Sequence, residues 1–137
     1  MTTLASDTAM VMAAGLGKRM RPLTASQPKP MVRVGGKPLI DHALDRLTEA
    51  GVARAVVNVH YLADALEAHL KARKAPAVTV SDERAVLLET GGGMIKALPH
   101  LPDPFFCLNA DNVWLDGPSS AFAELSARWN PQEMDAL

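Results

Sequence analysis

The stretch from Met10 to Met31 restricts the fold more than any other feature of this sequence. In it, a short apolar run ends abruptly in a loop that is rich in glycine and cationic residues. Gly15 and Gly17 permit tight turns and let bare backbone N–H groups approach an anion. Four cationic side chains then follow in the same stretch: Lys18, Arg19, Arg21 and Lys29. This combination predicts a phosphate-binding loop directly after a buried strand.

Apolar runs alternate with helical patterns along the 137 residues of the chain. The apolar runs, which predict strands, cover residues 9–13, 53–59, 78–81 and 104–108. Apolar residues at helical spacing predict helices over residues 39–50, 63–73, 94–98 and 119–129. This alternation predicts a three-layer α/β fold with a mostly parallel sheet. The length of the chain predicts one domain, residues 1–137.

Composition excludes several classes of protein. A net charge of −1, with no long run of Lys or Arg, gives no bulk affinity for nucleic acid or for an anionic membrane. No apolar run approaches the ~20 residues that span a bilayer, and the first residues lack the features of a signal peptide. Cytoplasmic residence is therefore expected. Cys107 is the single cysteine, so no intrachain disulfide is possible, and its apolar neighbours predict a buried, inert thiol.

Three unusual segments follow predicted strands. They are the glycine-cation loop after the first strand, the triple-glycine segment L-L-E-T-G-G-G after the third, and N-A-D-N after the fourth. Ligands gather outside the carboxyl ends of parallel strands, so we expect all three segments to form one site. His60 and Tyr61 follow the second strand and are candidates for a sugar pocket.

Two common nucleotide-binding motifs do not match the glycine-cation loop. A P-loop needs a glycine five places before Gly17 and a Ser or Thr after Lys18, and neither is present. The dinucleotide fingerprint needs a third glycine where Met20 stands. Asp111, directly after the fourth strand, is well placed to hold Mg²⁺ together with phosphate oxygens. A turn-capping role for Asp111 is equally compatible with the residues alone.

The motifs together resemble those of a known family. A-A-G-L-G-K-R-M-R-P-L-T, followed by P-K-P-M, resembles the signature of the sugar-phosphate nucleotidylyltransferases. L-E-T-G-G-G with K-A-L-P, and N-A-D-N-V-W, most resemble the branch that uridylylates N-acetylmuramate 1-phosphate in peptidoglycan recycling. The resemblance extends from Thr8 to about Trp129 and implies the Rossmann-like nucleotide-diphospho-sugar transferase fold.

By this resemblance, Gly15 and Gly17 donate backbone hydrogen bonds to nucleotide phosphates. Arg19 neutralises charge on the triphosphate and on the departing pyrophosphate, and Lys29 grips the phosphate at the reacting centre. Asp111 corresponds to the metal-binding aspartate, which implies Mg²⁺ as cofactor. Family members with an N-G-D motif have glycine where Ala110 stands here. The remaining residues expected at the nucleotide are Ala13, Ala14, Glu89, Thr90, Gly91, Gly92 and Asn109.

The reaction implied is transfer of a nucleoside monophosphate, from UTP, to N-acetylmuramic acid 1-phosphate with release of pyrophosphate. The family's enzymes continue through a sugar-binding part that carries a second metal-binding aspartate and another phosphate-contacting lysine. We therefore expect residues 1–137 to represent the nucleotide-binding part without the sugar-binding part. Two alternatives remain open: a GTP-dependent mannose or heptose 1-phosphate guanylyltransferase, and a non-catalytic nucleotide-binding fragment.

Overall fold

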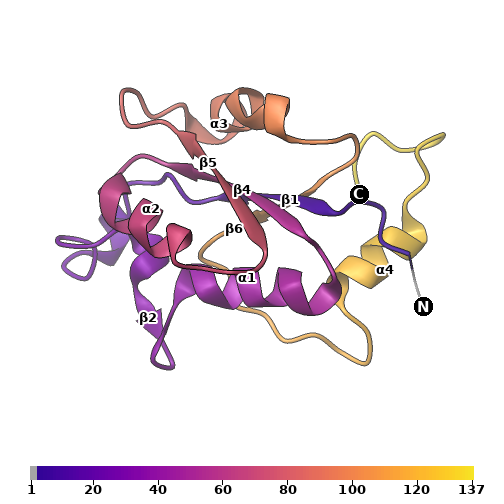
Figure 1. Cartoon of the computed structure of the whole chain (residues 1–137), viewed down its shortest axis with the longest axis horizontal. Helices are drawn as coiled ribbons and strands as arrows, with labels where there is room; N and C mark the ends of the chain where they lie inside the picture. Colours follow the sequence, from indigo (N-terminus) through magenta and orange to yellow (C-terminus); the bar gives the residue numbers. More distant parts are fainter. Residues whose placement is uncertain (1–2) are drawn as a thin grey trace.

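A computed structural model describes residues 3–137 of the chain. The elements alternate along the chain as expected (Figure 1). They are β1 (Thr8–Met12), η1 (Lys18–Met20), η2 (Lys29–Met31), β2 (Arg33–Val34), β3 (Lys37–Pro38), α1 (Leu39–Ala50), β4 (Arg54–Val59), α2 (Ala63–Lys71), β5 (Ala77–Asp82), α3 (Glu89–Ala97), η3 (Leu98–His100), β6 (Phe106–Asn109) and α4 (Ala121–Arg128).

The main sheet is parallel and has the strand order β5-β4-β1-β6. From β1 the chain adds β4 and β5 on one side and then crosses to place β6 on the other side of β1. The order thus reverses between β1 and β6, which is the kind of switch point where α/β sheets bind ligands. A separate antiparallel hairpin, β2 with β3, leads into α1. The α/β fold predicted from the sequence is confirmed.

Helices cover both faces of the sheet, which gives three layers (Figure 1). The larger core joins α1, α2 and α4 to one face of the sheet, with Ile40, Leu44, Leu66 and Phe122 among its buried side chains. The smaller core, on the other face, packs Ala97 of α3 against Met10 and Val56. Gly51 ends α1 in the left-handed conformation (φ 89°), as its position in the sequence predicts.

Two local expectations were wrong. Helix α3 begins at Glu89, five residues before the predicted start at Met94, so the triple glycine belongs to the helix and not to a loop. Cys107 is exposed and not buried, although partial burial raises the pKa of its thiol. Phe106 and Leu108 face the larger core. Successive side chains of a strand point to opposite faces, so Cys107, which lies between them, points to the other face of β6. Within residues 3–137, β6 pairs only with β1, and it is therefore an edge strand.

Within residues 3–137, no helix combines the length and the apolar character that crossing a membrane requires.

Candidate active site

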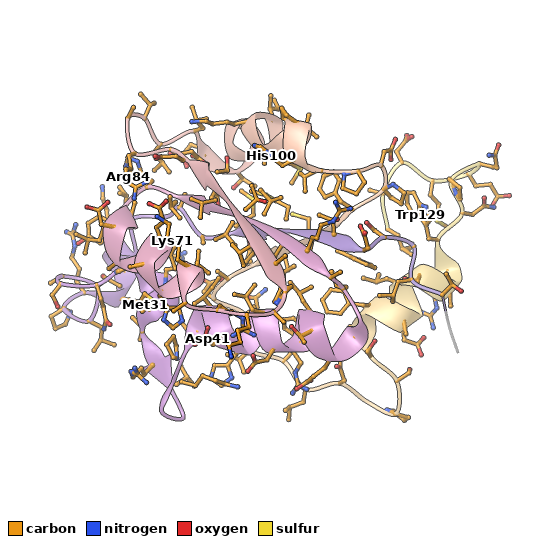
Figure 2. The ribbon with its side chains drawn as sticks, viewed as in Figure 1. Met31, Asp41, Lys71, Arg84, His100 and Trp129 are labelled. Carbon is orange, nitrogen blue, oxygen red and sulfur yellow. The ribbon has the colours of Figure 1, made fainter. Side chains whose placement is uncertain are left out.

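The candidate site lies at the carboxyl ends of β1 and β6. Met12 and Asn109 are partners in the register of these two strands, and the backbone N–H of Ala110 donates to the carbonyl of Met12 at 3.0 Å. The glycine-cation loop follows β1, and Asp111 lies in the loop that follows β6. Strand pairing therefore brings these two segments together at the switch point. Figure 2 shows Met31 and Arg84 at one end of the molecule and Trp129 at the opposite end.

The two loop glycines have different surroundings. Gly17 is left-handed (φ 64°), and an added Cβ would lie 2.9 Å from Cγ2 of Thr24. Gly15 is exposed, and an added Cβ would meet no atom within 4 Å. Gly17 is thus required by the fold of the loop, because a side chain there would be both strained and crowded. Gly15 leaves open space on the cavity side, as backbone contact with a ligand requires.

Hydrogen bonds from neighbouring segments hold the loop in place. The hydroxyl of Thr24, which is buried, donates to the carbonyl of Gly17 at 2.6 Å. The hydroxyl of Tyr61 in turn donates to the carbonyl of Thr24 at 2.7 Å. Tyr61 therefore supports the loop from behind, and it does not line the cavity. His60 also lies outside the cavity wall, so the structure supports neither residue as part of this pocket.

Lys29 and Asp111 form an ion pair inside the site. Nζ of Lys29 lies 2.5 Å from Oδ2 of Asp111, and both side chains are partly exposed. Lys29 is the first residue of the short helix η2, in which Pro30 is buried. The K-P-M sequence thus fixes a turn from which the lysine reaches the loop after β6. One cation and one carboxylate are thereby held together beside the glycine-cation loop.

A cavity of about 500 Å³ joins these groups. This volume falls in the usual range for small-molecule sites. Its wall contains ten of the twelve residues predicted for the site, and the convergence of the three segments is confirmed. The ten residues are Ala13, Ala14, Gly15, Gly17, Arg19, Lys29, Glu89, Thr90, Asn109 and Asp111.

Gly91 and Gly92 do not line the cavity. Both lie in the first turns of α3, whose next glycine packs inward on the sheet. An added Cβ on Gly93 would lie 2.8 Å from Oε2 of Glu83 and 2.9 Å from Nδ2 of Asn58. Close packing at Gly93 thus accounts for one glycine of the triple-glycine segment.

Several residues of the wall were not expected from the sequence. Lys18 is exposed and contributes to the wall. Asn58 also lines the cavity, although it lies within β4 and is almost fully buried. Asn58 is a polar residue inside the apolar run A-R-A-V-V-N-V, and this was the one feature of the sequence that could have indicated its place in the site. The remaining unexpected residues are Met12, Leu16, Met20, Pro30, Leu87 and Ala110.

The side chains fit a magnesium ion that is shared with a ligand. Within the described part of the chain, no group of three or more His, Cys, Asp or Glu side chains could form a metal cage. Mg²⁺ commonly binds through one or two carboxylates together with substrate phosphates. Asp111, at the cavity wall beside the glycine-cation loop, suits that kind of binding.

The fold and the site define a nucleotidyltransferase-type α/β domain. Its structure resembles that of UDP-glucose pyrophosphorylase in complex with UDP-glucose, with a TM-score of 0.77 over 93% of this chain and 55% of the other. At 19% identity, that likeness shows the fold alone. The family model for the MobA-like NTP transferase domain matches residues 9–137, and the chain belongs to this family.

Two relatives are similar in sequence. N-acetylmuramate alpha-1-phosphate uridylyltransferase of Caulobacter vibrioides is 54% identical over 132 residues, which cover 93% of this chain and 54% of the relative. A mannose-1-phosphate guanylyltransferase catalytic subunit beta, from Drosophila pseudoobscura pseudoobscura, is 37% identical over 82% of this chain and 32% of the relative. The chain thus spans about half the length of the first relative and a third of the second.

Proposed function

We propose that this chain supplies the nucleotide-binding part of a uridylyltransferase that acts on N-acetylmuramic acid 1-phosphate. The observation that carries the proposal is the cavity in which the glycine-cation loop meets the Lys29–Asp111 pair. The similarity to the Caulobacter relative supports UTP and this sugar phosphate as the substrates. The proposed reaction releases pyrophosphate and belongs to peptidoglycan recycling in the cytoplasm.

The chemistry requires alignment and charge compensation more than proton transfer. A phosphate oxygen of the sugar 1-phosphate attacks the α-phosphorus of UTP. The bond from that phosphorus to the oxygen that bridges the α- and β-phosphates breaks, and this oxygen leaves as a terminal oxygen of pyrophosphate. Because the attacking phosphate is already anionic at neutral pH, no general base is needed. Fixed cations then offset the charge that collects on the reacting and departing oxygens.

Different residues of the cavity wall are proposed to align the phosphates and to offset their charge. Gly15 offers backbone to the phosphates, and Arg19 of η1 lines the same cavity. Lys29 packs beside Gly17 of the same loop, is paired with Asp111, and supplies a positive charge for the reacting phosphate. Asp111 would hold Mg²⁺, which supplies further charge neutralisation on the phosphates when it is bound.

A guanylyltransferase acting on mannose or heptose 1-phosphate is the second candidate. It shares the phosphate chemistry and differs in the base and the sugar. The lower identity of the mannose-1-phosphate relative, 37% against 54%, favours the uridylyltransferase. A nucleotide-binding fragment without transfer activity is the third candidate, because the chain spans about half of its relative.

One assay separates the three candidates. The 137-residue chain is mixed with Mg²⁺, UTP and N-acetylmuramic acid 1-phosphate, and pyrophosphate release is followed. A parallel reaction uses GTP with mannose or heptose 1-phosphate, and calorimetry measures the binding of each nucleotide. Pyrophosphate from the UTP reaction alone supports the proposal, and preference for GTP supports the second candidate. Binding of UTP without release of pyrophosphate supports the non-catalytic fragment. If the chain binds no nucleotide and releases no pyrophosphate, all three candidates are excluded.

A further inference from the structure

A buried chain of hydrogen bonds runs behind the cavity. The backbone N–H of Ala13 donates to Oδ1 of Asn58 at 2.6 Å. Nδ2 of Asn58 donates to Oε2 of Glu83 at 2.8 Å, and the backbone N–H of Leu88 donates to Oε1 of Glu83 at 3.0 Å. Asn58 and Glu83 are each 1% exposed. We call this set of three hydrogen bonds the Asn58–Glu83 relay.

The relay joins two walls of the cavity that are far apart in sequence. Ala13 is the residue after β1 and opens the phosphate loop, whereas Leu88 lies between two wall residues, Leu87 and Glu89. Strands β1, β4 and β5 are adjacent in the sheet, so residues at their carboxyl ends lie in a row. The relay follows that row across the sheet and ties the phosphate loop to the start of α3.

The relay includes the buried carboxylate of Glu83. A contribution to stability alone does not explain why a carboxylate is buried there. Burial of a carboxylate is costly even when N–H groups donate to it, and apolar residues of similar size often serve stability as well or better. Within the described residues, both donors to the Glu83 side chain are neutral, one an amide side chain and one a backbone group. What Glu83 provides instead is two acceptors at fixed positions.

The segment that the relay holds is strained. Glu89, next to Leu88, has a positive φ of 60°, which residues other than glycine rarely adopt. Such a conformation persists only where surrounding contacts enforce it, and it is common at ligand sites. The N–H of Leu88 is anchored by Glu83, and Gly93 leaves room for Glu83 and Asn58 under α3. Anchoring by Glu83 therefore helps to keep Glu89 and Thr90 at the cavity.

We propose that Glu83 is a positioning residue, which through Asn58 sets the phosphate loop and through Leu88 sets the opposite wall of the nucleotide site. The inference rests on the proposed function in so far as the ligand is a nucleotide. The proposal depends on which groups in the relay donate hydrogen bonds and which accept them. A carboxylate accepts at both oxygens and thereby orients the Asn58 amide with its oxygen toward Ala13.

Polarity-swapping variants test this direction at constant shape. Glu83→Gln places an NH₂ group where the relay needs an acceptor, so two donors face each other. Asn58→Asp leaves two acceptors face to face. In the double variant, the new carboxylate at position 58 accepts from Ala13 and from the new amide at position 83, and the oxygen of that amide accepts from Leu88. The double variant thus restores all three hydrogen bonds with the same net charge.

The first readout is UTP affinity by calorimetry, with unfolding midpoints measured alongside. Each single variant should bind UTP about tenfold more weakly, the scale of one unsatisfied buried polar group. The double variant should return to within about threefold of the wild type, because coupled residues are strongly non-additive. Glu133→Gln, at an exposed position, is the matched control and should bind as the wild type does. A double variant that binds no better than the weaker single variant overturns the proposal.

The second readout needs no nucleotide. Amide hydrogen exchange at Ala13 and Leu88 should accelerate together in both single variants and slow again in the double variant. Equal exchange in all four proteins overturns the relay. If the wild type fails to bind UTP, the proposed function fails, and the exchange comparison still decides the relay. If a single variant unfolds, a folded double variant with slow exchange supports the relay, and an unfolded double variant overturns it.

Discussion

Nζ of Lys29 and Oδ2 of Asp111 lie 2.5 Å apart, although they come from η2 and from the loop after β6. Each partner is otherwise exposed to the cavity, so the pair holds the two charges in place without a ligand. A metal ion at Asp111 would compete with the Lys29 ammonium for the same carboxylate. Nucleotide phosphates can resolve this competition, because they offer Lys29 a second anionic partner.

This arrangement predicts that Asp111→Asn uncouples UTP binding from Mg²⁺. In the wild type, Mg²⁺ should strengthen UTP binding by about tenfold, the scale of one charged contact. In Asp111→Asn that enhancement should disappear, because the amide is a poor ligand for Mg²⁺ and carries no charge. Calorimetric titrations of UTP with Mg²⁺ and with EDTA measure the effect. Asp103→Asn, at an exposed position outside the cavity, is the control, and an unchanged Mg²⁺ effect in Asp111→Asn would exclude Asp111 as a ligand.

Arg19→Ala should lower kcat about a hundredfold, the typical effect of removing one preorganised electrostatic donor. The reason is that Arg19 lines the cavity, where we expect it to offset charge on the triphosphate and the departing pyrophosphate. Pyrophosphate release at saturating UTP and sugar phosphate measures kcat. Arg21→Ala is a matched control, because Arg21 lies on the same loop and does not line the cavity. Unchanged turnover in Arg19→Ala removes Arg19 from the mechanism.

Alanine at the two loop glycines should separate binding from folding. Gly17→Ala should destabilise the fold by about 1 kcal/mol or more, since a Cβ at a positive φ would be strained and would meet Thr24. Gly15→Ala should change stability by no more than about 0.5 kcal/mol, because its Cβ would enter open space. The methyl group would nevertheless obstruct the approach of phosphates. Urea denaturation and UTP calorimetry test both variants, and a Gly15→Ala protein with normal UTP affinity contradicts the role of Gly15.

Acid should remove the stabilisation that Asp45 provides between α1, β3 and the end of α2. Burial tends to raise the pKa of Asp45, but hydrogen bonds from Lys37 and Arg73 outweigh burial and hold the pKa below the usual 3.8. Lys37 lies 2.6 Å from one carboxylate oxygen, and Arg73 pairs with the other. A lowered folded-state pKa gives stability that is present above pH 3.8 and is lost as the pH falls through the folded-state pKa.

The measurement is urea denaturation of the wild type and Asp45→Asn between pH 7 and about pH 2.5, which brackets the ordinary carboxyl range. The wild type should be the more stable protein at pH 7, and its advantage should shrink below pH 3.8. Asp103→Asn serves again as the control, because Asp103 forms no ion pair within residues 3–137. An advantage that stays constant over the whole range would show that the Asp45 charge does not contribute.

Local patterns predicted the elements well where burial and periodicity agree. The run before Gly15 is β1, and the segment ending at Gly51 is α1, because a buried strand and an amphipathic helix each leave a periodic signal. The start of α3 was missed, because glycine disfavours helix in isolation. In the structure, close packing of Gly93 against Glu83 and Asn58 outweighs that preference.

The sequence by itself determined the alternation of strands and helices, the cationic glycine loop and the family, since each depends on residues that are near neighbours in the chain. Only the tertiary structure decided which strands are neighbours and which side chains make contact. It placed Lys29 against Asp111 and connected Ala13 through Asn58 to Glu83. These contacts depend on the strand order β5-β4-β1-β6, which no local pattern encodes. Burial of Asn58 and Glu83, which makes their hydrogen bonds matter, exists only once the sheet and α3 have packed together.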